Sequence, residues 1–335
     1  MKLYLSETLR SALVMMTAVG SCVVGADTIE EGPITESYYK TILPGASDTT
    51  HKYSSIVTDG NVVIRTVKDN GKSNNMEFGK IEANTVTIST HRGNIGLGDV
   101  SADTISISTN KGDITISGSV QASSPGSSIS ISGGDATGGS FILDNASLSN
   151  VGLSNQWFDE SDNVIYDGTV TISGNTTLTD VYFATGSVEV EEGSSLVLDN
   201  VLFTTLENSN NGLPADTGLV LGDNVTLTLN AGETLNVKEL TVGSGVDIVI
   251  TLSNEEFLTL DNREFNIFSV ENGEIDFADV NFTFTDGEQY KSGIISATGG
   301  TISVTGSQII AVPEPTTATL SLLALCGLTA RRRRK

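Results

Sequence analysis

Aromatic and acidic side chains gather in one short stretch near the middle of the chain. Trp157 and Phe158 stand directly before Asp159, and Asp162 follows three residues later. An aromatic ring can stack on the face of a sugar, and carboxylate oxygens can bind sugar hydroxyls or Ca²⁺. An EF-hand loop is excluded, because Val164 stands where that loop requires glycine. Trp157, Asp159 and Asp162 are therefore candidate ligand-binding residues, and the alternative is a plain loop whose aromatic rings cover the end of the core.

Other chemistry-bearing residues do not form a catalytic pattern. Glu191 and Glu192 are adjacent, so on a strand their side chains would point to opposite faces. The chain has two histidines, His51 and His91, and neither can be combined with a nucleophile or with other metal ligands at a suitable spacing. We therefore expect no catalytic residue, no metal site and no cofactor.

The charge of the chain is strongly acidic, with a formal net charge of −23. Residues 26–311 carry 39 acidic and 11 basic residues, which gives this region a charge near −28. No Lys or Arg occurs from Gly112 to Val237. Such a surface repels phosphate backbones and anionic lipids, so we expect no nucleic-acid partner.

The C-terminal end has three parts in a fixed order. The prolines of Val312-Pro313-Glu314-Pro315 favour an extended segment. Residues 316–330 are uncharged and mostly apolar, and a basic run closes the chain. A helix of this length spans ~23 Å, short of a hydrocarbon core of ~30 Å, so it is a marginal membrane anchor. The cations would keep the end on the cytoplasmic side; they are Arg331, Arg332, Arg333, Arg334 and Lys335.

This order of parts resembles the PEP-CTERM sorting signal of Gram-negative bacteria. The resemblance rests on Pro313, Glu314 and Pro315, followed by the apolar segment and the basic run. It implies that an exosortase-type membrane enzyme recognises the motif, removes the tail and passes the body to the outer surface, often together with exopolysaccharide. A plain C-terminal tail anchor is the alternative.

The N-terminal end is typical of a secretory signal peptide. Lys2 and Arg10 precede an apolar stretch that reaches residue 25, so we expect residues 1–25 to direct export through the Sec machinery. Acylation of Cys22 is an alternative. The two cysteines, Cys22 and Cys326, both lie in the end segments, so we expect a body without disulfides.

The body contains a repeat. Residues 85–90, Thr-Val-Thr-Ile-Ser-Thr, recur 19 positions later as Thr-Ile-Ser-Ile-Ser-Thr at residues 104–109, and a looser copy begins at Ser128. This alternation puts Val and Ile on one face of a strand and hydroxyls on the other. One unit cannot bury its apolar face alone, so the pattern predicts stacked coils in an all-β fold, a β-solenoid similar to a parallel β-helix. We expect corner glycines with positive φ at Gly93, Gly98, Gly112 and Gly118.

The repeat resembles those of bacterial adhesins with β-solenoid bodies, and the later strands are similar in general pattern to autotransporter-like passenger regions. We expect an N-terminal cap at residues 26–60, a solenoid body at residues 61–311 and the sorting signal at residues 312–335. No segment of the body has a convincing helical period.

Three functions fit these features. The favoured one is a non-enzymatic surface or extracellular-matrix protein, adhesin-like or structural, exported across the inner membrane, transiently anchored there and finally at the cell surface or extracellular. The second is a surface module that binds carbohydrate or Ca²⁺, with neutral glycans or exopolysaccharide as partners. The third, a glycan-active enzyme, needs a cleft with convergent acids.

Overall fold

The computed structural model describes residues 27–43, 48–67, 72–132, 139–158, 164–166, 168–205, 215–273 and 275–310. The chain divides into two compact units, whereas the sequence analysis treated residues 61–311 as one body. The first unit contains the residues up to Ile142 together with Asn150–Gly168, and the second contains Leu143–Ser149 and the residues from Thr169 onward. The expected signal peptide, Cys22 and the expected sorting signal with Pro313, Glu314 and Pro315 lie outside the described residues.

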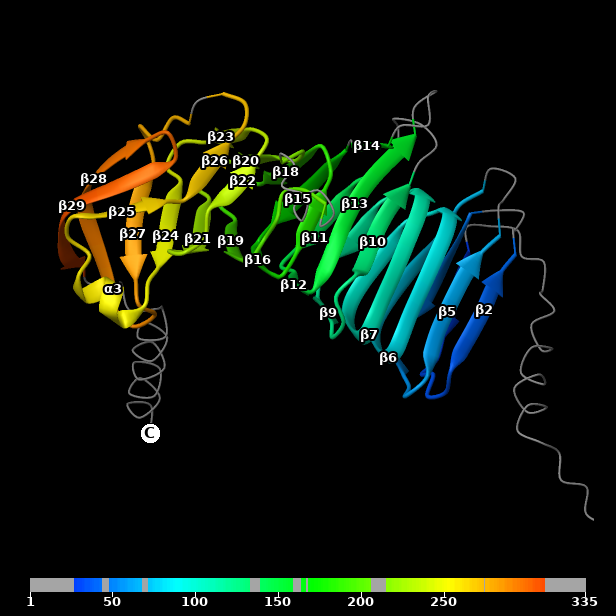
Figure 1. Cartoon of the computed structure of the whole chain (residues 1–335). Helices are drawn as coiled ribbons and strands as arrows, with labels where there is room; N and C mark the ends of the chain where they lie inside the picture. The colour runs from blue at the N-terminus through cyan, green and yellow to red at the C-terminus, as the bar shows by residue number, and fades with distance from the viewer. Residues whose placement is uncertain are drawn as a thin grey trace, which may run out of the picture. The chain divides into compact units, whose positions relative to one another are not determined.

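The first unit is a stack of parallel coils. Strand β1 (Asp27–Glu31) pairs with β3 (Thr49–Tyr53), which pairs with the start of β6 (Asn74–Arg92). On another side, β2 (Tyr38–Ile42) pairs with β5 (Asn61–Thr66), which pairs with the end of β6. Figure 1 shows β2, β5, β6, β7 and β10 side by side in this order. The other strands are β4 (Ile56–Val57), β7 (Ile95–Lys111), β8 (Ile114–Ile116), β9 (Ser119–Ala122), β10 (Ser127–Ser132), β13 (Val151–Phe158) and β14 (Val164–Tyr166), while β11 (Phe141–Asp144) is divided between the units.

The register confirms the β-solenoid and the repeat. Val86 pairs with Ile105 at the expected offset (105 minus 86, or 19), and Ser128 pairs with Ser106 in the third copy. Val86, Ile88, Ile105 and Ile107 are at most 1% exposed. The branched aliphatic side chains therefore form the core of the coils, as the alternation predicts.

The solenoid begins before the expected boundary at residue 60. The parallel ladder already includes β1, and an isolated parallel bridge joins Ile34 to Ile56. The offset between paired residues is 22 from Asp27 to Thr49 and 25 from Thr49 to Asn74. Because these coils differ in length, the first two cannot be recognised in the sequence by a constant repeat length.

Two of the four predicted corner glycines have positive φ and two do not. Gly93 and Gly112 have φ values of 139° and 149°. Gly98 and Gly118 do not have positive φ, which corrects the prediction for these two. They are glycines because the coils stack closely: a Cβ on Gly118 would lie 2.6 Å from the carbonyl carbon of Gly98.

The second unit also contains parallel coils and ends in antiparallel strands. Strands β16, β19, β21, β24 and β27 pair in parallel, and β28 and β29 then close the unit in antiparallel pairing (Figure 1). The strands are β12 (Ser147–Ser149), β15 (Thr169–Ser173), β16 (Asn175–Thr179), β17 (Tyr182–Ala184), β18 (Ser187–Val190), β19 (Ser195–Asp199), β20 (Gly218–Leu221), β21 (Thr226–Asn230), β22 (Leu235–Val237), β23 (Leu240–Val242), β24 (Asp247–Thr251), β25 (Arg263–Asn266), β26 (Phe268–Val270), β27 (Asn281–Thr285), β28 (Tyr290–Thr298) and β29 (Thr301–Ile310).

One short helix, α3 (Asn254–Leu258), departs from the expectation that the body has no helix. Ser253 and Glu256 form a capping box at its start, and Phe257 is its buried residue. Five residues are too few to produce a visible helical period. No helix within the described residues is long and apolar enough to cross a membrane.

Candidate functional site

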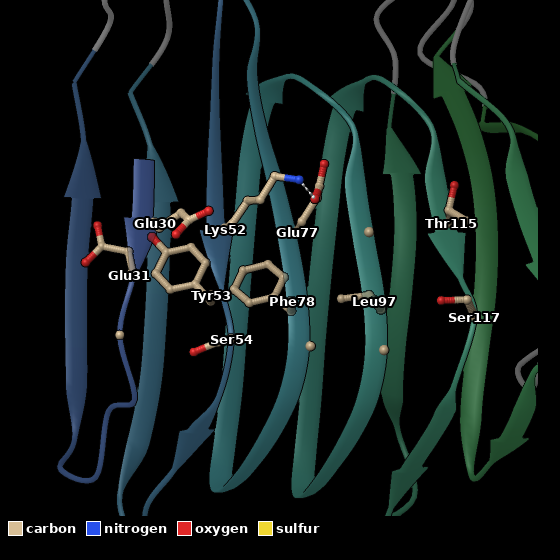
Figure 2. A pocket seen from close by; sticks show the side chains of 14 residues that line it. Glu30, Glu31, Lys52, Tyr53, Ser54, Glu77, Phe78, Leu97, Thr115 and Ser117 are labelled. Atoms are coloured by element: carbon tan, nitrogen blue, oxygen red, sulfur yellow. Dashed lines mark ion pairs between the residues drawn. The ribbon is translucent and has the colours of Figure 1, made fainter. Parts of the chain in front are cut away.

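A groove of about 800 Å³ crosses successive coils of the first unit (Figure 2). Its lining comes from equivalent positions of β1, β3, β6, β7 and β8, which the parallel register brings together in rows. Since paired strands lie about 4.8 Å apart, each row repeats at that spacing along the groove. The outer row is Glu30, Lys52, Glu77, Gly96 and Thr115; the middle row is Glu31, Tyr53, Phe78 and Leu97; and the corner row is Gly32, Ser54, Gly79, Gly98 and Ser117.

The outer row carries most of the charge of the groove. The Lys52 Nζ atom lies 2.7 Å from Glu77 Oε2, and both side chains are about half exposed. Figure 2 shows these two side chains reaching toward one another, with Glu30 on the other side of Lys52. The hydrogen bond to Glu77 and the charge of that carboxylate raise the pKa of the Lys52 amine. The lysine is thus held as an ammonium between two carboxylates.

Three residues of the middle row, Tyr53, Phe78 and Leu97, form the apolar base. The rings of Tyr53 and Phe78 stack with centroids 4.8 Å apart and an angle of 9° between their planes. Figure 2 shows Tyr53, Phe78 and Leu97 side by side on neighbouring strands. All three are nearly buried, so they contribute little exposed surface to the groove. Burial raises the pKa of the Tyr53 hydroxyl, with Tyr38 adding to the effect.

Glycines shape the groove in two ways: one leaves open space, and others allow the main chains of adjacent coils to approach closely. Gly96 follows Glu77 in the outer row, and a Cβ there would lie 3.6 Å from the Glu77 Cγ atom, an ordinary contact. Gly79 and Gly98 in the corner row have no room for a side chain, because a Cβ on Gly79 would lie 2.6 Å from the Ser54 carbonyl oxygen. The groove therefore exposes main chain at the corner and empty space at Gly96.

The interior of the first coil, next to the groove, is polar. Glu31 on β1 and Lys40 on β2 form an ion pair across the inside of the coil, and both side chains are mostly buried. Tyr38 lies edge-on to Tyr53, with ring centroids 6.1 Å apart. Burial, followed by the charge of Glu31, raises the pKa of Tyr38 to about 12. We refer to Glu31, Tyr38, Lys40 and the neighbouring His51 as the interior cluster.

A second hollow and a hydroxyl face occur on the same unit. The hollow has a volume of about 490 Å³, and Asp59, Glu82 and Asp103 are among the residues that line it. On the outer face of β6, β7 and β10, the register aligns Ser89 with Ser108 and Ser108 with Ser130. Among the described residues, no three His, Cys, Asp or Glu side chains are arranged to hold a metal ion.

Comparison with known proteins matches a stretch that lies mostly in the first unit. Residues 41–154 are similar to the family described as Toastrack DUF4097. This is a β-rich repeat fold, in agreement with the stacked coils. No curated protein and no solved structure matches the chain. The match covers 114 of the 335 residues, and it includes most of the groove but not Glu30, Glu31 or Gly32.

Of the candidate ligand-binding residues, the structure describes only the main chain of Trp157. The main chain of Trp157 belongs to β13 and pairs with Ile165 of β14 in antiparallel register. Asp159 and Asp162 lie outside the described residues, as do the Arg331–Arg334 run and Lys335. The proposed binding loop therefore stays a prediction.

The histidines and the adjacent glutamates have distinct environments. His91 lies at a coil corner with its Nδ1 atom 3.1 Å from Nδ2 of Asn110, which is its counterpart in the repeat. His51 is inside the first unit and 4% exposed. Glu191 and Glu192 follow β18 and enter a turn instead of a strand, so the expected alternation does not apply to them.

Sequence reasoning missed the groove. Glu30, Lys52 and Glu77 lie at unequal spacing (52 minus 30 is 22, and 77 minus 52 is 25), and no motif links them. The signal that could have found part of it is the repeat itself. Gly79 and Gly98 stand at the offset of the repeat (98 minus 79, or 19), and Phe78 and Leu97 have the same spacing.

Proposed function

We propose that this protein is an exported, non-enzymatic surface or extracellular-matrix protein, and that its groove binds a neutral glycan. The observation that carries the proposal is the alignment of the groove with the coils. Its lining consists of equivalent residues of successive coils, so the same main-chain geometry recurs along its length. A linear polymer with a short repeat can make similar contacts at each step of such a groove.

The chemistry of the lining supports a neutral, hydroxyl-rich ligand. Glu30 and Glu77 offer carboxylate oxygens as hydrogen-bond acceptors, and Ser54, Thr115 and Ser117 offer hydroxyls. Lys52 is already paired with Glu77, so it gives little net attraction for an anion. The groove therefore disfavours uronic acids and phosphates, in keeping with the acidic charge of the whole chain.

The apolar base supports the same ligand class. Tyr53, Phe78 and Leu97 are the large apolar residues in a lining that is otherwise mostly polar or glycine. Sugars have apolar C–H faces beside their hydroxyls, and binding sites for them combine both kinds of contact. The uncharged hydroxyl face around Ser108 is a second surface compatible with a polyhydroxylated polymer.

The export route is the other half of the proposal. The resemblance of residues 312–335 to a PEP-CTERM signal supports an exosortase-type enzyme and the Sec machinery as processing partners. A protein delivered in this way would meet exopolysaccharide at the cell surface, where a glycan-binding groove is useful.

A variant that fills the groove tests whether the groove binds the glycan. Gly96→Leu places a side chain in the open space beside Glu77 without a steric clash, because the nearest atom to the new Cβ lies at 3.6 Å. Gly306→Leu on β29 is the control, since a Cβ there meets no atom within 4 Å. In affinity electrophoresis through neutral polysaccharides, Gly96→Leu should lose its retardation, while Gly306→Leu should migrate like the wild type.

Two results would count against the proposal. Equal retardation of the Gly96→Leu variant and the wild type would remove the groove as the binding site. Release of short oligosaccharides from a polymer, abolished by changing one acidic residue, would replace the non-enzymatic function with a glycan-active one.

A further inference from the structure

The interior of the first coil differs chemically from that of the coils that follow. The position of Glu31 is taken by Tyr53, Phe78 and then Leu97 in successive coils. The position of Lys40 is taken by Ile64 and then Ile88. A charged pair thus occupies the first coil at places where the other coils have large apolar side chains.

His51 lies one coil further in, on β3. It is 4% exposed, and its Nδ1 atom is inaccessible and has no hydrogen-bond partner in the structure. Its neighbours in the ladder are Ile29 and Met76, which cannot stabilise a charge. A neutral imidazole fits this environment, whereas an imidazolium would lose its hydration without gaining a partner.

The charged and titratable groups around His51 do not compensate for this loss. Lys40 faces it from β2 and adds a positive charge, and Glu31 on β1 is already paired with Lys40. Tyr38 on β2 is neutral up to high pH because of its raised pKa. From β5 and β6, the interior residues near His51 carry no charge; they are the apolar Val62, Ile64, Met76 and Phe78 and the buried polar residue Asn74.

Among the described residues, the strands of the first coil also have fewer pairing partners than those of the second coil. In the described part of the chain, β1 pairs with β3 alone and β2 with β5 alone. By contrast, β3 and β5 each pair on two sides. Strands with a ladder on one side open at lower free-energy cost than strands with ladders on both sides.

We propose that proton uptake by His51 releases β1 and β2 from the coils that follow. We refer to this acid-sensitive first coil as the latch. Strand β1 supplies Glu30 and Glu31 to the groove, and Gly32 follows it. Release of the first coil therefore removes one end of the groove. The consequence for glycan binding rests on the proposed function, whereas the latch itself does not.

The direction of the pH effect follows from the environment of His51. Burial, followed by the charge of Lys40, lowers the pKa of His51 below its usual value of 6.5, and Glu31 opposes this in part. The folded coil then binds fewer protons than the open coil at pH values below 6.5. The equilibrium constant for opening of the first coil does not change with pH well above 6.5. Below that value it increases by up to about tenfold for each unit by which the pH falls.

Hydrogen exchange of the full-length protein measures the opening directly. Between about pH 7.5 and about pH 5, after correction for intrinsic exchange rates, peptides from β1 and β2 should lose protection, while peptides from β7 should keep it. His51→Gln should abolish the pH dependence of β1 and β2, because glutamine does not titrate. His91→Gln, which changes the corner histidine, should leave it intact.

Three results would overturn the latch. These are equal loss of protection in β1 and β7, the same pH dependence in His51→Gln and the wild type, and an NMR titration of wild-type His51 at or above its usual pKa. The NMR titration needs no variant, so it decides even if His51→Gln does not fold.

The latch and the glycan site can fail separately. Both are supported if the wild type binds a neutral glycan at about pH 7.5 and releases it at about pH 5, while His51→Gln retains it. If no glycan binds at either pH but β1 and β2 still open on acidification, the proposed function fails and the latch stands.

Discussion

Gly98 stacks on Gly79 so closely that a Cβ on Gly98 would lie 2.2 Å from the Gly79 carbonyl oxygen. Two residues earlier on the same strand, Gly96 leaves space for a side chain. The two glycines of β7 therefore have opposite roles: Gly98 allows the coils to stack, and Gly96 leaves the groove open.

This difference gives a paired stability prediction. Gly98→Ala should lower the free energy of unfolding by about 1–3 kcal/mol, because the new methyl group forces the main chain of two coils apart. Gly96→Ala should be neutral or stabilising by up to about 1 kcal/mol, since alanine costs less conformational entropy in a strand. Urea denaturation followed by circular dichroism compares the two, and equal effects would show that the coils are not stacked as described.

The alternation on β7 predicts opposite outcomes for neighbouring residues. Ile107→Asp should destabilise the first unit by several kcal/mol, because it buries a carboxylate without a partner in the core. Ser106→Asp on the same strand should change stability by less than about 0.5 kcal/mol, since Ser106 is exposed. Thermal unfolding monitored in the far ultraviolet measures both, and tolerance of Asp at residue 107 would contradict the solenoid register.

The raised pKa of Tyr38 in the interior cluster predicts a loss of stability at high pH. Burial raises the pKa of Tyr38 to about 12. Its hydroxyl ionises near pH 10 in the unfolded chain, so its stabilising contribution is complete below that pH and is lost as the pH rises toward the folded pKa. Ultraviolet absorbance of tyrosinate should show a fraction of tyrosines that ionises only above pH 11 or on unfolding. Tyr38→Phe should reduce that fraction, and an unchanged titration would contradict the burial of this ring.

The sorting prediction concerns the C-terminal residues. If the PEP-CTERM resemblance is functional, surface material should contain no peptide from Thr316 onward, as measured by mass spectrometry. Changing Pro313, Glu314 and Pro315 to alanine should keep the precursor in the inner membrane. Mature surface protein that still contains residues 320–325 would contradict this route.

The core of the middle coils follows from sequence because their period is constant. Val86 and Ile105 occupy equivalent places in copies of equal length, so alternation and offset together define both the strand and its partner. The first coil could not be found in this way, because the ladder steps are unequal: 22 from Ile29 to His51 and 25 from His51 to Met76.

The candidate site depends on these irregular coils. The contact between Glu31 and Lys40 crosses the inside of a coil, and no local pattern indicates which of 39 acidic residues a given lysine meets. The prediction that Gly98 has a positive φ was also wrong, because Gly98 is needed for close stacking of the coils. A glycine that permits positive φ and one that permits close stacking look alike in a sequence.

The claim that the groove is the binding site is tested most directly by NMR with selective ¹⁵N labelling of glycine. Gly79, Gly96 and Gly98 lie in the groove, and Gly218, Gly222 and Gly243 of the second unit serve as internal controls. Titration with a neutral oligosaccharide should shift the amide signals of the first three glycines and leave the last three in place. No shift in the groove glycines at saturating ligand, or shifts confined to the second unit, would contradict the account.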